Sequence, residues 1–331
     1  MGIKSLTNSI KKESPDSITH ENLYKLSGKR VAVDASLVIY QNLLNIGNRP
    51  LFKNSKGKVT NHLSGLFYKI VNYKSLNIEM IFVFDGKPPE IKSDTIKDRK
   101  NKSDNAKLKM ETAVTQEDKD KYEKASLRLT KEIIDDVKKL LRLMGVSYIH
   151  PNGEGEAYAS ELCRIGYVDY VLTEDMDTLV YGCPKLIRNC VDKSLKRKDI
   201  ISIFDYDKII NDFNITSEQF IEFCILCGCD YCDSVPKIGN ISALKLIKKY
   251  GSIDEIVKNT NYNFPENYLE LFNKSKDIFL MWKDKIDKDN VPIVNSQMNI
   301  ADLIHFLVGE IEMNEKKVDN GIKKMMNNNF K

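Results

Sequence analysis

The sequence predicts an α/β fold in which a mostly parallel central sheet is flanked by helices. One observation is a series of short β-branched or aromatic runs, each bounded by turn residues, at residues 30–34, 80–85, 146–150, 170–173 and 186–191. Another is the helical periodicity between these runs, at residues 36–44, 62–73 and 131–144. Strands that alternate with helices in this way form parallel sheets covered on both faces.

The residues of each predicted element show why it should form. The run RVAVD at 30–34 is apolar up to a final acid, and the helical pattern 36–44 follows it directly. The run MIFVFD at 80–85 has the same form. The pattern at 131–144 places its apolar side chains on one stripe and stops at Gly145, as helices commonly do at glycine. These elements are expected to build one core.

Two regions depart from this alternation. Residues 91–127 are charged, poor in large apolar side chains and rich in helix formers, which predicts a mobile helical arch or cap. From Ser217 onward the pattern is helical, with one helix expected around Trp282, and the Lys/Asn-rich end is expected to fray. We therefore predict a first core region, an arch insertion, a second region completing the same core, a helical region with a helix–hairpin–helix, and a frayed tail, at residues 1–90, 91–130, 131–216, 217–313 and 314–331.

The overall charge does not force a polyanionic partner, because 51 Lys+Arg and 47 Asp+Glu leave a net charge of only +4. The excess is local, since residues 87–110 hold eight basic and four acidic residues. Seven cysteines without an apolar leader suit a reducing compartment, and Leu6 breaks the myristoylation pattern. We expect an intracellular monomer that has no membrane anchor.

Seven acidic side chains stand at or near the ends of the apolar runs: Asp34, Asp85, Glu154, Glu156, Asp175, Asp177 and Asp230. Ligands of such sheets collect at the carboxyl ends of strands, so several of these acids are expected on one rim. Clustered carboxylates repel one another unless cations join them, and hard oxygen ligands suit Mg²⁺ or Mn²⁺. Two such ions can clamp the attacking and leaving oxygens of a phosphodiester. The set therefore predicts a two-metal nuclease, with Asp34, Asp85, Glu154 and Asp175 also catalytic.

Each acid taken alone has a plainer interpretation as a turn or N-cap residue. Asp175 and Asp177 are two residues apart in a loop, and side chains at this spacing in an extended segment point the same way. Glu154 and Glu156 open a helix, where residues two apart diverge by about 200°. At least one of these glutamates must therefore ligate from an irregular first turn or through water. No metal-ligand spacing joins the histidines, His20, His62, His150 and His305.

Basic residues near the acids suggest contacts with phosphate. Lys92 and Arg99 are seven residues apart, two turns on one helical face, so both are expected to reach a scissile phosphate. The alternative is a solvated charged face. The segment SVPKIGNISALKLIKKYG resembles a helix–hairpin–helix with its turn at Gly239, although any glycine turn between packed helices would look similar. Paired cysteines at 224, 227, 229 and 232 suggest zinc, but one residue between the pairs is too short for the usual site.

The order of motifs along the chain resembles the flap endonucleases of the structure-specific 5′ nuclease family, from Met1 to about Met325. The motifs that carry this resemblance are MGIKSL, VAVDASLVIYQ, HLSGLFY, VFDGKPPEIK, LLRLMGVSYIHPNGEGEA, TEDMDTLVYG, FCILCGCDYCDSVPKIG and LIHFLVGE. The resemblance implies a PIN-like nuclease core that cleaves branched DNA near the base of a 5′ flap, in replication and repair, with two Mg²⁺ ions held by the seven acids.

The resemblance also implies roles for residues outside the acid set. Lys92 and Arg99 match residues at the base of the family's arch that contact the scissile phosphate. Tyr40 matches its base-stacking aromatic, and Gly2 matches a buried N-terminus near the active site. The hairpin would bind duplex with a K⁺ ion. The residues predicted to contact DNA are Gly2, Tyr40, Lys131, Lys237, Gly239 and Lys245.

The chain departs from the family pattern in two places. Lys237 replaces the first glycine of the predicted helix–hairpin–helix turn, and Ile241 and Ser242 stand where basic residues are usual. Both changes put the binding of duplex DNA at this turn in doubt. No clamp-binding box ends the chain, so docking to a sliding clamp is not supported. A Lys/Asn-rich composition suggests an AT-rich genome, such as that of a parasite or a large virus. The expected compartment is a nucleus or a viral or parasite replication compartment. The alternatives are a 5′→3′ exonuclease of the same family, a non-catalytic scaffold that binds DNA junctions, and a ribonuclease.

Overall fold

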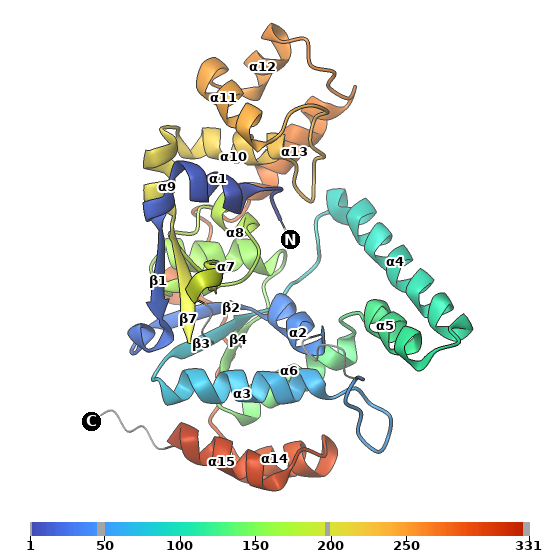
Figure 1. The fold of residues 1–331 in the computed structure, drawn as a ribbon. Coiled ribbons are helices and arrows are strands. Elements are labelled where there is room, and N and C mark those ends of the chain that lie inside the picture. The colour runs from blue at the N-terminus through green and yellow to red at the C-terminus, as the bar shows by residue number, and fades with distance from the viewer. Residues whose placement is uncertain (1, 45–49, 196–198, 327–331) are drawn as a thin grey trace. The chain divides into compact units, whose positions relative to one another are not determined.

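The computed structural model describes residues 2–44, 50–195 and 199–326 (Figure 1). The chain forms two compact units, each assembled from segments that are distant in the sequence. The first unit comprises Met1–Lys25, Asp85–Thr95 and Pro151–Val291, and the second comprises Leu26–Phe84, Ile96–His150 and Pro292–Lys331. The five regions predicted from the sequence are divisions along the chain, and they stay a prediction.

The strands of the first unit lie in the order β1 (Ile18–Asn22), β7 (Ile200–Asp205), β6 (Lys185–Asn189) and β5 (Tyr170–Leu172). β5 and β6 are parallel, whereas β7 pairs antiparallel with both β6 and β1. The helices that accompany these strands are α1 (Leu6–Glu13), α7 (Gly155–Arg164), α8 (Asp177–Val180) and α9 (Tyr206–Phe213). Buried Leu186 and Phe204 lie in the same apolar core as Leu6 and Ile10 of α1, so the sheet is covered by the helices.

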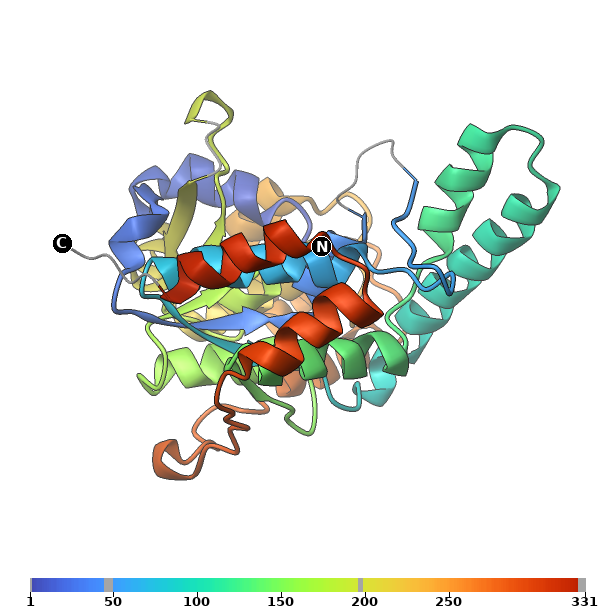
Figure 2. The same ribbon diagram turned by 90° about the horizontal axis from the view of Figure 1, so that it is seen from below.

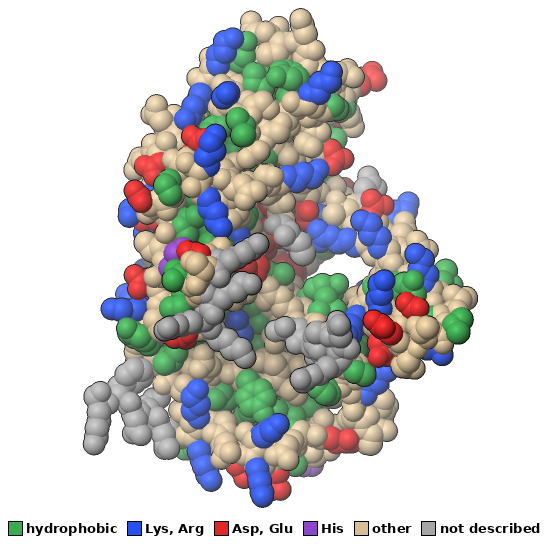
Figure 3. Space-filling view, in the orientation of Figure 1, with side chains coloured by type: hydrophobic (Ala, Val, Ile, Leu, Met, Phe, Trp, Pro, Cys, Tyr) green, Lys and Arg blue, Asp and Glu red, His purple; other side chains and the backbone are tan. Residues whose placement is uncertain are grey.

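The rest of the first unit is helical, with α10 (Ser217–Cys227), α11 (Asn240–Tyr250), α12 (Ile253–Asn259) and α13 (Tyr268–Phe279). α10 begins at a capping box, in which the Thr216 side chain accepts from the Gln219 backbone and the Gln219 side chain accepts from the Thr216 backbone. Phe220 and Phe223 of α10 pack edge-to-face against Phe213 at the end of α9, which joins these helices to the sheet core. Lys and Arg side chains are spread over the surface of α11 and α12 in Figure 3.

The second unit holds three parallel strands in the order β2 (Arg30–Asp34), β3 (Glu79–Val83) and β4 (Ser147–Ile149). Its helices are α2 (Ala35–Leu44), α3 (Asn61–Ser75), α6 (Lys131–Leu143), α14 (Ile300–Ile304) with a π-helical continuation, η6 (His305–Glu310), and α15 (Glu315–Met326). Figure 2 shows α15 lying along α3. A Cβ at Gly321 would fall 2.6 Å from the Phe67 ring, so glycine is what allows α15 to approach α3 so closely.

A hairpin of two helices, α4 (Ser93–Thr112) and α5 (Gln116–Ser126), occupies the stretch expected to form an arch. The Thr115 hydroxyl caps α5 by accepting from the Asp118 backbone at 3.1 Å. Both signs of charge cover the hairpin in Figure 3. Short 3₁₀ turns complete the described elements at Pro15–Ser17, Leu23–Leu26, Glu90–Lys92, Lys193–Leu195 and Lys288–Asn290. No helix in the described ranges is both long and apolar enough to cross a membrane.

The α/β class predicted from the sequence is confirmed, and three details need correction. β1 and β7 were not predicted, because ITHEN is polar and IISIFD follows a charged stretch without a helical element before it. The helix expected around Trp282 ends at Phe279, and Trp282 lies in the turn that follows. The end of the chain was expected to fray, but α15 is helical because Val318, Ile322 and Met325 form a buried stripe. Residues 327–331 lie outside the described residues.

Candidate active site

Asp85 and Glu154 are brought together where two loops of the first unit meet. The Gly86 backbone N–H donates to the Gly153 carbonyl at 2.8 Å, and a Cβ at Gly86 would overlap the Pro151 carbonyl oxygen. This close approach of two backbones explains why glycine stands after Asp85. Asp85 Oδ1 then accepts from the Gly155 backbone at 2.8 Å, at the positive end of α7. The loop contact therefore fixes Asp85 against the start of the helix that carries the glutamates.

The two glutamates differ in their backbone positions. Glu154 is the N-cap of α7 with an extended backbone, φ −64° and ψ 124°, whereas Glu156 lies in the first helical turn. The divergence expected for residues two apart in a regular helix therefore does not apply to Glu154, since it precedes the helix. Glu154 is also buried, with 8% of its surface exposed. The irregular geometry that the sequence required of one glutamate is found at Glu154.

Asp175 and Asp177 converge by a turn and not by an extended segment, which corrects the geometry expected from their spacing. Met176 between them has a helical backbone, and the Asp177 N–H faces Asp175 Oδ1 at 3.3 Å. The Asp175 N–H in turn donates to the Thr173 hydroxyl at 3.1 Å, just beyond β5. This is the local hydrogen bonding that favours aspartate in turns. Both carboxylates are almost fully buried.

The N-terminal segment closes over this aspartate pair. The Ile3 backbone N–H donates to Asp177 Oδ1 at 2.8 Å, and Gly2 has φ +84°. A Cβ at Gly2 would overlap Asp175 Oδ1 and lie 2.5 Å from Asp177 Oδ1. Position 2 therefore excludes any side chain on two grounds, its backbone conformation and the space that the carboxylates occupy. The structure places Gly2 at the acids; its contact with DNA stays a prediction.

Lys92 is the basic residue that lies among the acids. Its Nζ donates to Glu154 Oε2 at 2.9 Å and lies 3.6 Å from Asp230 Oδ2. It also lies over the Tyr231 ring, 5.6 Å from the centroid. The prediction that Lys92 and Arg99 share one helical face needs correction, because α4 begins at Ser93, after the 3₁₀ turn that ends at Lys92. Arg99 lies within α4, in the second unit.

The pKa values of the acids are shifted by burial and by the charges of neighbouring residues. Burial raises the pKa of Glu154, which Lys92 opposes and Asp85 and Asp230 reinforce. Burial also raises the pKa of Asp175, and it raises that of Asp177 well above the usual range, with Asp230 adding to both shifts. Burial disfavours the charged form of Lys92, but the neighbouring oxygens of Tyr231, Glu154 and Asp230 outweigh it and raise the Lys92 pKa. Burial and the neighbouring carboxylates therefore disfavour the charged forms of Glu154, Asp175 and Asp177.

The donor set fits hard divalent cations. Every candidate ligand is a carboxylate oxygen, and Mg²⁺ takes only one or two protein carboxylates while keeping several waters. Among the described residues, no group of three or more His, Cys, Asp or Glu side chains is arranged so that it could hold one ion. The arrangement is one of neighbouring pairs, Asp175 with Asp177 and Glu154 with Asp230. Such pairs suit ions that retain water, and not a closed site of four protein ligands.

The remaining candidate residues lie elsewhere. Asp34 ends β2 in the second unit, where its Oδ1 accepts from the Leu37 backbone at 3.0 Å and 6% of its surface is exposed. Tyr40 lies in α2, and Lys131 is the first residue of α6. Both belong to the second unit. The structure describes six of the seven acids within the first unit and Asp34 within the second. Their assignment as metal ligands stays a prediction.

The segment predicted to form a helix–hairpin–helix includes α10, the loop after it, and α11. Lys237, which stands where the family has glycine, has φ +68°, a conformation that glycine adopts without strain. Gly239 is the N-cap of α11, and the Ser242 hydroxyl accepts from its N–H at 2.9 Å. Ser242 thus stabilises the turn, and Lys245 is exposed on α11. A glycine at position 237 would adopt this backbone conformation without strain.

The four cysteines at 224, 227, 229 and 232 are free thiols. Burial raises the pKa of Cys227 and Cys229 to about 12, and that of Cys232 to about 11. Zinc binds the thiolate form, so each thiol would have to lose a proton that burial holds.

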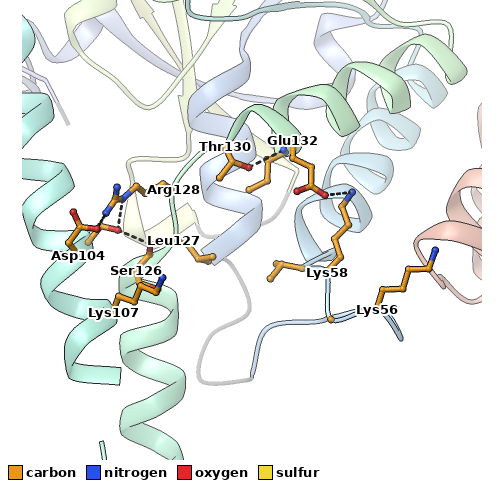
Figure 4. A pocket seen from close by; sticks show the side chains of 13 residues that line it. Lys56, Lys58, Asp104, Lys107, Ser126, Leu127, Arg128, Thr130 and Glu132 are labelled. Carbon is orange, nitrogen blue, oxygen red and sulfur yellow. Dashed lines mark hydrogen bonds and ion pairs between the residues drawn. The ribbon is translucent and has the colours of Figure 1, made fainter. Parts of the chain in front are cut away.

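Two groups of residues were missed by reasoning from the sequence. One is Tyr231 with Tyr181, whose hydroxyls lie 2.9 Å apart beside Lys92; the position of Tyr231 between Asp230 and Cys232 in GCDYC was the available signal. The other is a pocket of about 530 Å³ in the second unit, shown in Figure 4. Arg128 connects two sides of this pocket. Its guanidinium donates to the Ser103 hydroxyl at 2.8 Å and pairs with the Asp104 carboxylate, and both residues lie on α4. No pattern in the sequence marked Arg128.

Comparison with known proteins identifies the family. The XPG N-terminal domain model matches residues 1–106, and the XPG I-region model matches residues 145–230. Flap endonuclease 1 of Glycine max is 37% identical over 334 residues, which cover 98% of this chain and 86% of that protein. Flap endonuclease 1 of Naegleria gruberi is 38% identical over 333 residues, with 98% and 85% covered.

Solved structures agree with these relatives. The flap endonuclease-1 from Methanococcus jannaschii is 30% identical with a TM-score of 0.69, covering 95% of this chain and 97% of that one. The catalytic core of Rad2 in complex with DNA substrate has a TM-score of 0.71 at 23% identity, with 98% and 100% covered, and supports the fold alone. The chain therefore belongs to the flap endonuclease family, the structure-specific 5′ flap nucleases of DNA replication and repair.

Proposed function

We propose that this nuclease uses two Mg²⁺ ions, with Mn²⁺ as an alternative, to hydrolyse branched DNA close to the junction of a 5′ flap with duplex. A 5′→3′ exonuclease activity is expected at the same site. The proposed metal ligands are Asp34, Asp85, Glu154, Glu156, Asp175, Asp177 and Asp230. When bound, the ions would lower the pKa of the attacking water and stabilise charge on the leaving oxygen.

One observation carries this proposal: buried carboxylates face one another around a single lysine. Burial and mutual repulsion raise the pKa of Glu154, Asp175 and Asp177, so the pocket is short of positive charge. A scaffold that only binds DNA would gain nothing from this repulsion, since the acids also repel phosphate. Divalent cations relieve it and at the same time attract the substrate.

The chain's own residues would position the scissile phosphate and neutralise its charge. Lys92 lies at the acids and can donate to a phosphate oxygen, and Arg99 is proposed to act from α4. The fixed turn between Asp175 and Asp177 and the cap of Asp85 on α7 hold the carboxylates in place before substrate arrives. Such preorganisation is what accelerates the transfer of a phosphoryl group.

The proposed DNA contacts outside this pocket are Gly2, Tyr40, Lys131, Lys237, Gly239 and Lys245. Gly239 is the N-cap of α11, and the first backbone N–H groups of the helix that follows it are suited to bind a phosphate of the duplex. A K⁺ ion is proposed at the same turn. A related junction-resolving enzyme, GEN1, has been solved with product DNA, Mg²⁺ and Mn²⁺, which is consistent with such a substrate and such metals. Action as a monomer, in a nucleus or a viral or parasite replication compartment, completes the proposal.

A cleavage assay on a DNA substrate with two flaps tests the proposal. Wild-type protein with Mg²⁺ should release the 5′ flap, and Ca²⁺ should support binding without product. Glu154→Gln should reduce turnover by about 100-fold or more, because ligand geometry is lost. The matched control Glu266→Gln, in an exposed position, should behave as the wild type. Full turnover by Glu154→Gln with unchanged binding would contradict the assignment.

The same assay separates the alternatives. Product only from recessed or blunt ends would indicate an exonuclease without flap activity. Tight binding in Ca²⁺ with no product in Mg²⁺ would indicate a scaffold, and faster cleavage of an RNA flap than of a DNA flap would indicate a ribonuclease.

The contribution of Lys237 to duplex binding, in the turn before α11, can be tested by replacing Lys237 with glycine. Lys237→Gly should relieve the left-handed backbone, and loss of one phosphate contact should weaken duplex binding and reduce its salt dependence by about one charge. Lys208→Met is the control, because it removes one lysine charge elsewhere in the same unit without placing a glycine inside α9. Unchanged salt dependence in Lys237→Gly would remove Lys237 from the duplex contacts.

A further inference from the structure

The proposed metal pocket already contains a cation that belongs to the chain. Lys92 Nζ donates to Glu154 Oε2 at 2.9 Å and lies 3.6 Å from Asp230 Oδ2, and its side chain is 16% exposed. The same carboxylate oxygens are proposed above to hold divalent ions. An oxygen in direct contact with an ammonium group cannot also give its full charge to a metal ion. Lys92 and the metal ions therefore compete for the same ligands.

The lysine is supported by aromatic residues that are not candidate ligands. Its ammonium lies 5.6 Å from the centroid of the Tyr231 ring, within the range of cation–π attraction. Tyr231 is itself held, because its hydroxyl lies 2.9 Å from the Tyr181 hydroxyl and its ring packs against Phe279 with centroids 5.5 Å apart. Tyr181 packs on the same Phe279 ring at 5.1 Å. These three rings form a seat for Lys92 that does not depend on the carboxylates.

The seat is connected to the other acid pair. Tyr181 is the C-cap of α8, and its backbone N–H donates to the Asp177 carbonyl at 3.0 Å. Tyr231 follows Asp230 directly in the chain. The aromatic group therefore fixes the lysine relative to both carboxylate pairs, and it would continue to do so if the contacts between Lys92 and the carboxylates were broken.

We propose that Lys92 is a built-in counter-ion of the metal pocket, which holds Glu154 and Asp230 until divalent ions replace it and which is then retained over Tyr231, ready to bind the phosphate. This inference rests on the proposed function, since it concerns the same ligands. A dication attracts a carboxylate more strongly than an ammonium group does at similar distance, so the exchange favours the metal. The freed ammonium keeps one attractive partner, the Tyr231 ring.

The exchange has two consequences for this chain. Without metal, Lys92 offsets part of the repulsion among buried carboxylates and so stabilises the pocket. With metal, the same group is displaced toward the substrate, so that charge is supplied to the phosphate only when the ions are present. The residue is thus expected to weaken metal binding while it accelerates cleavage, two effects of opposite sign.

Titration calorimetry with Ca²⁺, in the absence of DNA, measures the competition directly. Lys92→Met keeps the length of the side chain and removes its charge, and it should bind Ca²⁺ about tenfold more tightly than the wild type. Lys92→Arg should bind as weakly as the wild type. The matched control Lys208→Met, an exposed lysine of the same unit, should leave Ca²⁺ affinity unchanged. Equal or weaker Ca²⁺ binding by Lys92→Met would overturn the inference.

Substitutions in the seat test the second part of the proposal. Tyr231→Phe retains the ring and should keep the turnover number within about threefold, whereas Tyr231→Leu removes the cation–π partner and should lower it by about tenfold or more. Because the lysine is misplaced and the DNA contacts remain, KM for the flap substrate should change little in either variant. A fall in turnover that is the same in Tyr231→Phe and Tyr231→Leu would overturn the role of the ring.

Thermal unfolding with and without Ca²⁺ controls for folding. Lys92→Met should unfold at lower temperature than the wild type in a chelator, and should gain more from saturating Ca²⁺, because tighter binding stabilises the folded state more. If the wild type itself binds no Ca²⁺ and shows no stabilisation, the proposed metal site fails, and the counter-ion role fails with it. If the wild type binds Ca²⁺ and Lys92→Met gains nothing, only the counter-ion role fails.

Discussion

The acid pocket of the first unit and the α4–α5 hairpin of the second are both rich in charge, yet they hold it in opposite ways. In the pocket, Asp175 and Asp177 are 6% and 5% exposed, and their pKa values are raised by burial. At the hairpin, Asp104 of α4 pairs with Arg128, two residues beyond the end of α5, and the side chains of Arg128 and Asp104 are 39% and 52% exposed. The pocket stores unfavourable electrostatic energy, whereas water screens the hairpin.

This difference determines where a change of charge should affect activity and stability most. A buried carboxylate without a partner costs free energy, so anything that neutralises it is bound strongly. An exposed ion pair contributes about 0–1 kcal/mol and is sensitive to salt. Removing the charge of a buried carboxylate in the pocket should therefore lower activity strongly and raise stability. Substitutions at the exposed charges of the hairpin should change activity and stability only weakly.

The largest effect is expected for Asp177→Asn. Cleavage should fall by about 100-fold or more because a proposed metal ligand is lost. In a chelator, the free energy of unfolding should rise by about 1–2 kcal/mol, since a buried charge is removed while the oxygen that accepts from Ile3 is kept. Urea unfolding and a flap assay measure both. Asp254→Asn, at an exposed position, is the control, and a loss of stability in Asp177→Asn would refute the stored repulsion.

A large effect of a different kind is expected for Gly2→Ala. The new Cβ would overlap Asp175 Oδ1, and the backbone at φ +84° would be strained. Turnover should fall by about 10- to 100-fold, because displaced carboxylates no longer hold the reacting groups in position. Single-turnover kinetics on flap DNA measure the effect. Lys4→Ala should leave turnover unchanged, and equal activity of Gly2→Ala would show that the segment before Ile3 moves away from the acids.

The stabilising effect of Asp177→Asn should depend on pH in a definite direction. Because the pKa of Asp177 is raised, the folded state binds its proton more tightly than the unfolded state does. The wild type is therefore destabilised above that raised pKa, and the penalty disappears as the pH falls through it toward the ordinary value for aspartate.

The difference in free energy of unfolding between Asp177→Asn and the wild type should thus increase as the pH rises toward the raised pKa of Asp177, and it should vanish in acid. His62 titrates in the same range, since burial lowers its pKa to about 4, but its contribution is common to both proteins and cancels. Unfolding in a chelator across the pH range measures this difference. A difference that grows as the pH falls would contradict the raised pKa.

The smallest effect is expected in the hairpin. Arg128→Gln removes the bonds to Ser103 and Asp104, but the guanidinium is exposed, so the global stability should change by less than about 1 kcal/mol. Hydrogen exchange should speed up locally in residues 116–128, because the Ser103–Ser126 contact loses its support. Lys107→Gln, on the same pocket wall, is the control (Figure 4). A large loss of global stability would mean that the hairpin is part of the core.

The parts of the fold that could be predicted from the sequence are those whose stability is local or periodic. β2 was placed at Arg30–Asp34 because a buried parallel strand is a continuous apolar run, and α6 because its stripe has helical spacing. β1 could not be predicted, since ITHEN pairs along the edge of a sheet and buries little of its own side chains. The sequence predicts a frayed end where α15 forms, because the few apolar residues of α15 are buried only by packing against α3.

By itself, the sequence determined the chemistry of this protein, because the identity and spacing of the carboxylates and the family motifs do not depend on distant contacts. The control of that chemistry depends on contacts that form when the chain folds. The turn at Met176, the exclusion of a side chain at Gly2, and the place of Lys92 between Glu154 and Asp230 all join residues far apart in the chain. Burial and charge coupling arise from such contacts, and no local pattern encodes them.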